Sequence, residues 1–353
     1  MKALIGMSGG VDSSVAAYLT MQAGFSCIGA TMRLYTGQDL EQSCCKQEDV
    51  QDARAVADRL GIPFHVFDMS NAFEKQVMEH FVSSYEQGLT PNPCVECNRH
   101  LKFDLFLQQA LQLGCSHIVT GHYARISQSP SGRYLLQKAV DTAKDQSYFL
   151  FRLTQQQLQH TRFPLGELTK AEARAIAEQC GFLNAKKRDS QDICFVPDGD
   201  YVAFLQRYTK KNYPCGNYLD LQGNIVGQHK GAIAYTLGQR KGLNLAMGSP
   251  VYVCGKDMHR NTVTVGPNEA LFHTTLLAND WTWIAIDGLT QPLRVMAKAR
   301  SRMAEQPATV YPEANGTATV VFDEPQRALT PGQAVVLYDG DTVIGGGTII
   351  QIL

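Results

Sequence analysis

The stretch Lys2–Ser14, KALIGMSGGVDSS, places a short apolar run directly before a cluster of glycines and hydroxyl residues. Lys2 to Met7 predicts a buried strand and Val11 to Ala23 predicts a helix, so the loop Ser8–Ser14 leads from a strand into a helix N-terminus. Glycines allow an anion to approach the backbone closely, and the N–H groups at a helix start attract negative charge. The stretch therefore predicts a phosphate-binding loop.

The loop matches neither of two common phosphate-binding motifs. No Gly-Lys-Ser/Thr follows, as a Walker A loop requires, and the G-x-G-x-x-G spacing of dinucleotide-binding folds is absent. Asp12 supplies a carboxylate that can help to hold Mg²⁺, while Ser13 and Ser14 supply hydroxyl donors. A tight strand–helix turn without a ligand is the plain alternative, which the crowding of small and hydroxylic residues in one place disfavours.

Predicted strands and helices alternate beyond the loop. Strands are expected at 25–32, 63–67 and 117–120, and helices at 48–60, 72–87 and 101–113. Such alternation is typical of an α/β fold with a doubly wound parallel sheet.

The character of the chain changes near residues 206–214, where strands begin to replace helices. Short alternating strands and the hairpin signal Asp339-Gly340-Asp341 then predict a small closed β-barrel. We expect a catalytic, ATP-binding domain at 1–205, a small central domain at 206–270 that contacts RNA, and a C-terminal β-barrel at 271–353.

The bulk composition is that of an ordinary globular protein. The chain has 353 residues, of which 44% are hydrophobic and 18% charged, with a net charge of −1. A nucleic-acid partner would therefore be met by local basic patches rather than by a global positive field. The first ten residues lack the apolar core of a signal peptide, and no run reaches the ~20 apolar residues that span a bilayer. We expect a cytoplasmic protein without a membrane partner.

Three of the ten cysteines stand in two informative strings. Thr90–Asn98, TPNPCVECN, contains Cys94 and Cys97, and Arg188–Phe195, RDSQDICF, contains Cys194. In a reducing compartment, such spacing more often serves metal, cluster or sulfur chemistry than a disulfide framework. Zinc binding and simple buried thiols remain alternatives. The adjacent pair Cys44-Cys45 is read first as two loop thiols, and second as a sulfur-relay or oxidation-sensing site.

With the loop, these strings resemble the tRNA-specific 2-thiouridylase family (MnmA/TrmU type) within the PP-loop ATP pyrophosphatases. The loop matches S-G-G-x-D-S, Pro91–Asn98 matches P-N-P-x-x-x-C-N, and Asp189–Phe195 matches D-S-x-x-I-C-F. Further strings match in the family's order, so the likeness covers nearly the whole chain; they are 120–125, 144–150, 236–242 and 329–333.

The resemblance implies ATP-dependent 2-thiolation of the wobble uridine, position 34 of tRNA. ATP adenylates the C2 oxygen, which is otherwise a poor leaving group, and a sulfur nucleophile then displaces AMP. Thiolate sulfur suits this step because it is strongly nucleophilic. The family's nucleophilic cysteine falls on Cys97 and its persulfide cysteine on Cys194, and a Cys97–Cys194 disulfide remains after sulfur release.

The resemblance also assigns binding residues. It implies ATP contacts through Gly6, Met7, Ser8, Gly9, Gly10, Val11, Asp12, Ser13, Met32 and Gly121. It implies tRNA contacts through His122, Lys144, Asp145, Gln146, Arg300, Ser301 and Gln333. Arg300 and Ser301 match a pair that meets the target base, and Ser301 stands where the family usually has an aromatic residue. Basic clusters are expected to support the RNA surface; they are 186–188, 210–211, 240–241 and 298–302.

Cys94 is a second departure, because many family members have Asp at this position. Cys94, Cys97 and Cys194 together can be read as three ligands of a [4Fe–4S] cluster whose fourth iron binds hydrosulfide. The persulfide relay and the cluster are both left open at this point.

Partners and alternatives follow from the same reading. We expect tRNAs for Lys, Glu and Gln as substrates, and a cysteine desulfurase or relay protein as the sulfur donor. A PP-loop synthetase or amidotransferase that adenylates a small metabolite is the main alternative, and such an enzyme needs neither the cysteine strings nor the barrel. A non-catalytic tRNA-binding protein is a third reading, which the intact loop disfavours.

Overall fold

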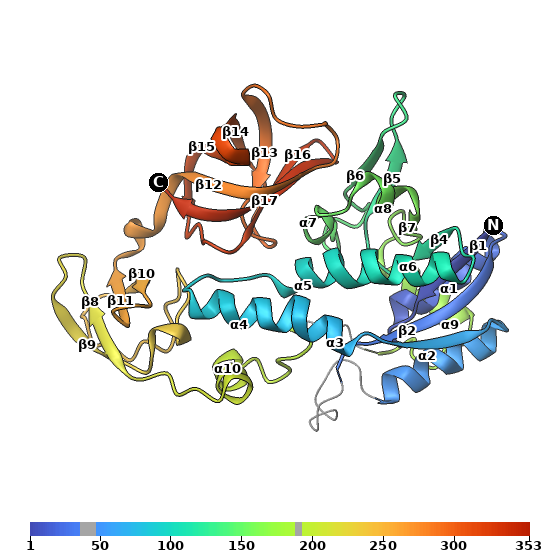
Figure 1. Ribbon diagram of the computed structural model, residues 1–353, viewed down its shortest axis with the longest axis horizontal. Coiled ribbons are helices and arrows are strands. Elements are labelled where there is room, and N and C mark those ends of the chain that lie inside the picture. The colour runs from blue at the N-terminus through green and yellow to red at the C-terminus, as the bar shows by residue number, and fades with distance from the viewer. Residues whose placement is uncertain (36–46, 188–192) are drawn as a thin grey trace.

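The computed structural model describes residues 1–35, 47–187 and 193–353, and its first unit is a parallel sheet (Figure 1). The strand order is β3-β2-β1-β4-β7, with every neighbouring pair parallel. The strands are β1 (Lys2–Gly6), β2 (Ser26–Arg33), β3 (Phe64–Asp68), β4 (His117–Val119) and β7 (Thr161–Arg162). The chain leaves β1 at the point where the strand order reverses, which is where open α/β sheets bind ligands.

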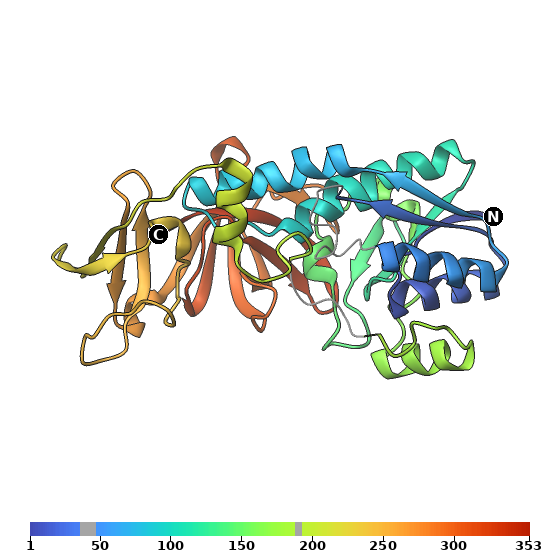
Figure 2. The same cartoon turned by 90° about the horizontal axis from the view of Figure 1, so that it is seen from below.

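Helices cover both faces of this sheet (Figure 2). Ala3 and Ile5 of β1 pack in one cluster with α1 (Val11–Gln22), α2 (Gln47–Leu60) and α9 (Lys170–Gln179). Leu4, between them, belongs to the opposite cluster with Phe73 and Phe106. Because neighbouring side chains of a strand point to opposite faces, β1 is buried on both sides. The expected doubly wound sheet is confirmed.

The helix that carries the first two cysteines starts earlier than its sequence pattern predicts. Helical structure begins at Pro93 instead of Leu101, and runs through α5 (Pro93–Glu96), the π-helix η3 (Cys97–Leu105) and α6 (Phe106–Gln112). Proline is well suited to the first helical position, because its missing N–H has no partner there. The predicted start at Leu101 was wrong, because a proline at the first helical position begins a helix instead of interrupting it. Cys94 and Cys97 therefore stand on one continuous helical segment, 93–112, which is called the cysteine helix below.

The helix expected at 72–87 is also built in pieces. It consists of α3 (Ser70–Phe73), the π-helix η2 (Glu74–Met78) and α4 (Glu79–Glu86). Shorter elements complete this part of the chain; they are β5 (Arg125–Gln128), β6 (Tyr134–Gln137), α7 (Ser147–Leu150), α8 (Gln155–Gln159) and α10 (Tyr201–Thr209).

A four-stranded sheet follows, in the order β10-β11-β8-β9. Its elements are β8 (Gly216–Leu219), β9 (Ile225–His229), η4 (Ala232–Ala234), β10 (Tyr252–Asp257), β11 (Thr262–Gly266) and η5 (Asn268–Leu271). A small cluster that includes the fully buried Tyr218 and Val253 forms its core.

The expected C-terminal barrel is confirmed, because β12 pairs with both β15 and β17 and so closes the sheet. Its elements are β12 (Phe272–Trp283), β13 (Leu293–Lys298), β14 (Gln306–Pro312), η6 (Ala314–Gly316), β15 (Ala318–Arg327), β16 (Ala334–Asp339) and β17 (Thr342–Ile352). The hairpin β5–β6 joins the barrel through the pairing of Gln137 with Thr342, so the first unit and the barrel share one sheet. None of the helices in the described ranges combines the length and apolarity needed to cross a membrane.

Candidate active site

The loop after β1 is held in one shape by its own hydroxyl groups. Ser13 Oγ accepts a hydrogen bond of 3.1 Å from the Ser8 N–H and donates one of 3.0 Å to the Gly10 carbonyl. Gly9 has a φ of +73°, and a Cβ on it would lie 2.3 Å from the carbonyl oxygen of Asp49. Only glycine fits this close approach. The loop therefore presents a fixed backbone at the N-terminus of α1.

Asn184, which the sequence reading missed, ties the loop to a distant segment. Its buried side-chain amide donates to the Gly9 carbonyl and to Ser14 Oγ, both at 2.9 Å. A single Asn far along the chain gives no local pattern that would reveal this contact.

Gly121, expected near the adenosine, lies directly against the loop. A Cβ on Gly121 would sit 2.7 Å from the Ser13 nitrogen and 2.8 Å from the Asp12 carbonyl carbon. Contacts this close leave no room for a side chain, so the end of β4 and the phosphate-binding loop form one surface.

Asp12 has two partners that were not anticipated. The Lys170 ammonium lies 2.7 and 2.9 Å from its two carboxylate oxygens, and the Tyr123 hydroxyl donates to it at 2.9 Å. Lys170 is the first residue of α9, whose start is fixed by the capping box of Thr169 and Glu172. Lys170 thus neutralises the one carboxylate of an anion-binding loop, and it would compete with Mg²⁺ for Asp12.

A cavity of about 570 Å³ brings the sequence-predicted strings together. Its walls come from the loop, the start of the cysteine helix, the segment after β4, residues 143–146 and the segment 193–195. The predicted site residues in this lining are Gly6, Met7, Ser8, Gly10, Val11, Asp12, Ser13, Met32, Cys94, Cys97, Gly121, His122, Lys144, Asp145, Gln146 and Cys194. The ATP loop and the three cysteines therefore face one space.

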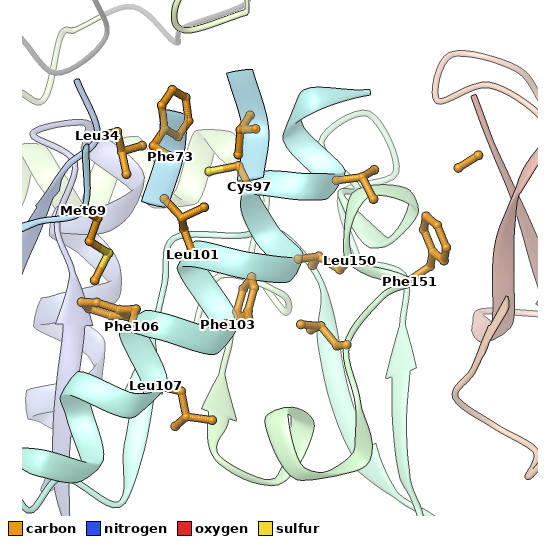
Figure 3. Packing of buried hydrophobic residues seen from close by; sticks show 14 of the residues in the cluster. Leu34, Met69, Phe73, Cys97, Leu101, Phe103, Phe106, Leu107, Leu150 and Phe151 are labelled. Atoms are coloured by element: carbon orange, nitrogen blue, oxygen red, sulfur yellow. The ribbon is translucent and has the colours of Figure 1, made fainter. Parts of the chain in front are cut away.

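The cysteines reach this space from differently packed positions. Cys97 is buried beside Leu101 and Phe73 in the core cluster (Figure 3), and Cys194 is partly buried against the same cluster. Cys94 is exposed to the cavity, yet burial of its thiol raises the pKa. The charge of the Lys102 ammonium partly lowers this pKa again, and the nearby Cys194 raises it further. Because Cys94 and Cys194 line the same cavity, segments 100 residues apart meet here.

Phe195 fixes the position of the segment that carries Cys194. Its ring makes edge contacts with Phe73 and Phe81, with centroid separations of 5.6 and 5.1 Å. Edge-to-face packing of this kind adds stability beyond the area it buries. The aromatic residue next to the cysteine therefore acts as its anchor.

Comparison with known proteins identifies the family of the chain. Family models match residues 1–198 (tRNA methyl transferase HUP domain), 202–267 (tRNA methyl transferase PRC-barrel domain) and 273–349 (Aminomethyltransferase beta-barrel domain). The tRNA-specific 2-thiouridylase MnmA of Clostridioides difficile (strain 630) is 49% identical, over 100% of this chain and 99% of the relative. The chain belongs to the tRNA-specific 2-thiouridylase family. A second thiouridylase, from Acetivibrio thermocellus, is 48% identical over 99% of both chains.

A solved 4-thiouridine synthetase–RNA complex with bound ATP resembles the chain only weakly. The two are 17% identical over 58% of this chain and 50% of that chain, with a TM-score of 0.40.

An iron–sulfur site made of Cys94, Cys97 and Cys194 does not fit the described geometry. Within 1–35, 47–187 and 193–353, no three His, Cys, Asp or Glu side chains are grouped closely enough to hold a metal ion. A cluster needs thiolates that converge on its irons. No step of the thiouridylase reaction therefore runs through a cluster. Cys44-Cys45 and residues 188–192 lie outside the described residues.

Three predicted tRNA contacts of the thiouridylase have structural partners in the cavity wall. His122 Nδ1 shares a hydrogen bond of 2.7 Å with Thr120, and burial, followed by the charge of Lys102, holds the pKa of its imidazole well below the usual value. The Asp145 carboxylate accepts a hydrogen bond of 2.8 Å from Ser147 Oγ, and the Gln146 side-chain oxygen accepts one of 2.9 Å from the Tyr123 N–H. These bonds fix the wall, and the assignment of the residues to tRNA stays a prediction.

Arg300, Ser301 and Gln333 lie outside the cavity lining. The Arg300 guanidinium points into the protein, where it donates to the Ala328 carbonyl at 2.6 Å and to Thr330. Gln333 Nε2 donates to the Thr90 carbonyl at 2.8 Å. Of these residues, Gln333 reaches the segment that leads into the cysteine helix.

One basic cluster expected to face RNA is partly engaged within the protein. The Lys187 ammonium pairs with Asp49 at 2.6 Å and with Asp52 at 2.7 Å, both on α2. Its two partners offset its charge, so Lys187 closes one side of the cavity instead of presenting a free cation. The cysteine helix contributes a further lysine, Lys102, which the sequence reading did not single out.

Proposed function

We propose that this chain uses ATP to exchange the C2 oxygen of the wobble uridine of tRNA for sulfur. The observation that carries the proposal is the shared cavity, in which the phosphate-binding loop and Cys94, Cys97 and Cys194 line one space. A metabolite synthetase would need the loop but not the cysteines. The close relatives named tRNA-specific 2-thiouridylase support the same activity.

The first half-reaction is adenylation. The loop backbone and the N-terminus of α1 hold the β and γ phosphates. The uridine O2 attacks the α-phosphorus, the bond to the bridging oxygen breaks, and pyrophosphate leaves with the electron pair. Mg²⁺ bound to the phosphates would lie near Asp12, although Lys170 already forms an ion pair with that carboxylate.

The second half-reaction is sulfur transfer. Cys194 accepts a sulfur atom from the donor as a persulfide. The Cys97 thiolate attacks Cys194 Sγ, which releases hydrosulfide and forms the Cys97–Cys194 disulfide. Hydrosulfide attacks C2, the C2–O bond breaks, and AMP leaves with its electrons. An external dithiol then reduces the disulfide for the next turnover.

The remaining parts of the proposal concern partners and organisation. The substrates are the tRNAs for Lys, Glu and Gln, and the donor is a cysteine desulfurase or a relay protein, in the cytoplasm, where tRNA and ATP occur together. Residues 1–205 form the catalytic domain, 206–270 the central domain and 271–353 the barrel. RNA contacts arise from the predicted tRNA residues named above.

The test combines the purified chain with ATP, Mg²⁺, a cysteine desulfurase with cysteine as the sulfur donor, a dithiol reductant and unmodified tRNA transcripts. Nucleosides from the digested tRNA are then analysed by mass spectrometry for 2-thiouridine. We expect product only with ATP, and a loss of at least about 100-fold in the Cys97→Ser and Cys194→Ser variants. Cys215→Ser is the matched control, because Cys215 is exposed and lies outside the cavity. Unchanged thiolation in Cys97→Ser would refute the sulfur-transfer route.

The same assay tests the synthetase alternative. Cleavage of ATP to AMP and pyrophosphate with a small metabolite, in the absence of RNA, would favour that reading. ATP cleavage that depends on tRNA supports the thiouridylase.

A further inference from the structure

Lys102 occupies an unusual helical position. It lies in the nine-residue π-helix η3, five residues after Cys97. In an α-helix, side chains five residues apart point about 140° away from each other. The i→i+5 bonding of a π-helix widens the turn and reduces this angle, so that such residues face more nearly the same side. Both Cys97 and Lys102 accordingly line the cavity.

The charges around the cavity single out the same residue. Asp12 is paired with Lys170, Lys187 is paired with Asp49 and Asp52, and Lys144 also has an interaction within the protein. The Lys102 ammonium, which is half-buried, makes no hydrogen bond or ion pair to any residue in the described ranges. A cation held inside a cavity without a carboxylate partner is costly unless an anion occupies the space during function.

The groups near Lys102 belong to both the cysteine part and the phosphate-binding part of the site. Its charge acts on the Cys94 thiol and on the imidazole of His122. His122 directly follows Gly121, which touches the phosphate-binding loop. Since burial keeps His122 neutral, Lys102 is the cation that acts on this part of the cavity wall.

On the basis of the proposed function, we infer that Lys102 is a catalytic residue that binds the phosphate of the adenylated uridine and stabilises AMP as it leaves. As sulfur forms its bond to C2, the C2–O bond breaks and its electron pair moves to the oxygen of AMP. The negative charge that develops there is stabilised by the Lys102 ammonium. The loop holds the pyrophosphate group, and Lys102 binds the phosphate of the adenylyl group that remains.

The first experiment measures AMP binding to the full chain by calorimetry, and needs neither tRNA nor sulfur. Lys102→Met should weaken AMP binding by about tenfold, and Lys102→Arg should retain most of it, because the charge persists. Lys75→Met is the matched control, since Lys75 is exposed on the other π-helix and lies outside the cavity lining. Circular dichroism checks that each variant is folded. Equal AMP affinity in Lys102→Met and the unaltered chain would overturn the inference.

The second experiment follows single turnovers with α-labelled ATP and tRNA. In Lys102→Met, pyrophosphate should form at a rate within about threefold of normal, while AMP release should slow by about 100-fold, typical of losing one charge-stabilising donor. Adenylated tRNA should therefore accumulate. Equal slowing of both steps would contradict a role in the departure of AMP. If the unaltered chain thiolates no tRNA, the proposed function fails, whereas AMP binding still decides for or against Lys102.

Discussion

Gln333, directly before β16 of the barrel, donates a hydrogen bond of 2.8 Å to the carbonyl oxygen of Thr90. Next to it, Gly332 packs so closely that a Cβ there would lie 2.8 Å from the Thr90 nitrogen. Thr90 stands three residues before Pro93, where the cysteine helix begins. The barrel thus holds the entrance to that helix.

Breaking this contact should slow sulfur transfer without affecting ATP binding. Gln333→Ala removes one neutral hydrogen bond, whose net value of about 0.5–1.5 kcal/mol corresponds to a loss of about two- to twelvefold. We expect that loss in kcat/KM for tRNA, measured by 2-thiouridine formation. Gln333→Glu should cost more, because a carboxylate would face the Thr90 carbonyl. Gln351→Ala, at an exposed position of β17, is the control. Full activity of Gln333→Glu would contradict the coupling.

Gly121→Ala should impair ATP binding. The added Cβ would lie 2.7 Å from the Ser13 nitrogen, and the loop backbone would have to shift. We expect the Kd for ATP to rise by at least about tenfold, since misplaced N–H donors lose their charge-assisted bonds. Gly288→Ala serves as control, because nothing described lies within 4 Å of its added methyl. Nucleotide titration monitored by calorimetry makes the comparison, and an unchanged Kd in Gly121→Ala would argue against the packing described.

The Lys170–Asp12 pair should show strong non-additivity. Lys170→Met leaves the Asp12 carboxylate uncompensated beside the bound triphosphate, and we expect ATP affinity to fall by about 10- to 100-fold. Replacing Asp12 by Asn in the same chain removes the repulsion, so the double variant should bind ATP better than Lys170→Met alone. A double-mutant cycle of ATP Kd values measures the coupling. Additive losses would show that the pair does not act as a unit.

Lys256 should make stability depend on pH. Its ammonium donates to the Tyr235 carbonyl at 3.0 Å and lies 6.0 Å from the Tyr85 ring centroid, and burial lowers its pKa to about 8. Below pH 8 the lysine is charged in both states and its burial penalty is complete. Between about pH 8 and the ordinary lysine value of 10.5, the folded protein binds fewer protons than the unfolded chain, so stability gains with rising pH.

Lys256→Met removes this penalty. The variant should be more stable than the unaltered chain at pH 7, by up to about 3 kcal/mol, and the advantage should shrink as the pH approaches 10. Urea unfolding of both proteins at several pH values isolates the effect, because the buried tyrosines contribute equally to each. An advantage that does not change with pH would contradict the assignment to Lys256.

The sequence by itself determined the chemical inventory. The glycines and hydroxyls of Ser8–Ser14 specify a strand–turn–helix anion site because their effect is local. The alternation of strands and helices fixed the doubly wound sheet, and the later short strands fixed the barrel, since periodicity records which faces are buried. The residue types of the strings around Cys97 and Cys194 left metal, cluster and sulfur chemistry open, and the resemblance to the thiouridylase family pointed to sulfur transfer.

Only the tertiary structure decided how these parts act on one another. Asn184 and Lys170 reach the loop from more than 150 positions away, and long-range contacts of this kind leave no periodic trace in a sequence. The π-helical turn that brings Lys102 to the cavity depends on packing around it and was invisible to a pattern based on 3.6 residues per turn. Arg300, Ser301 and Gln333, which lie in connections between barrel strands, are outside the cavity lining. The local sequence determines the chemistry that a side chain can perform, and the fold determines which groups it contacts.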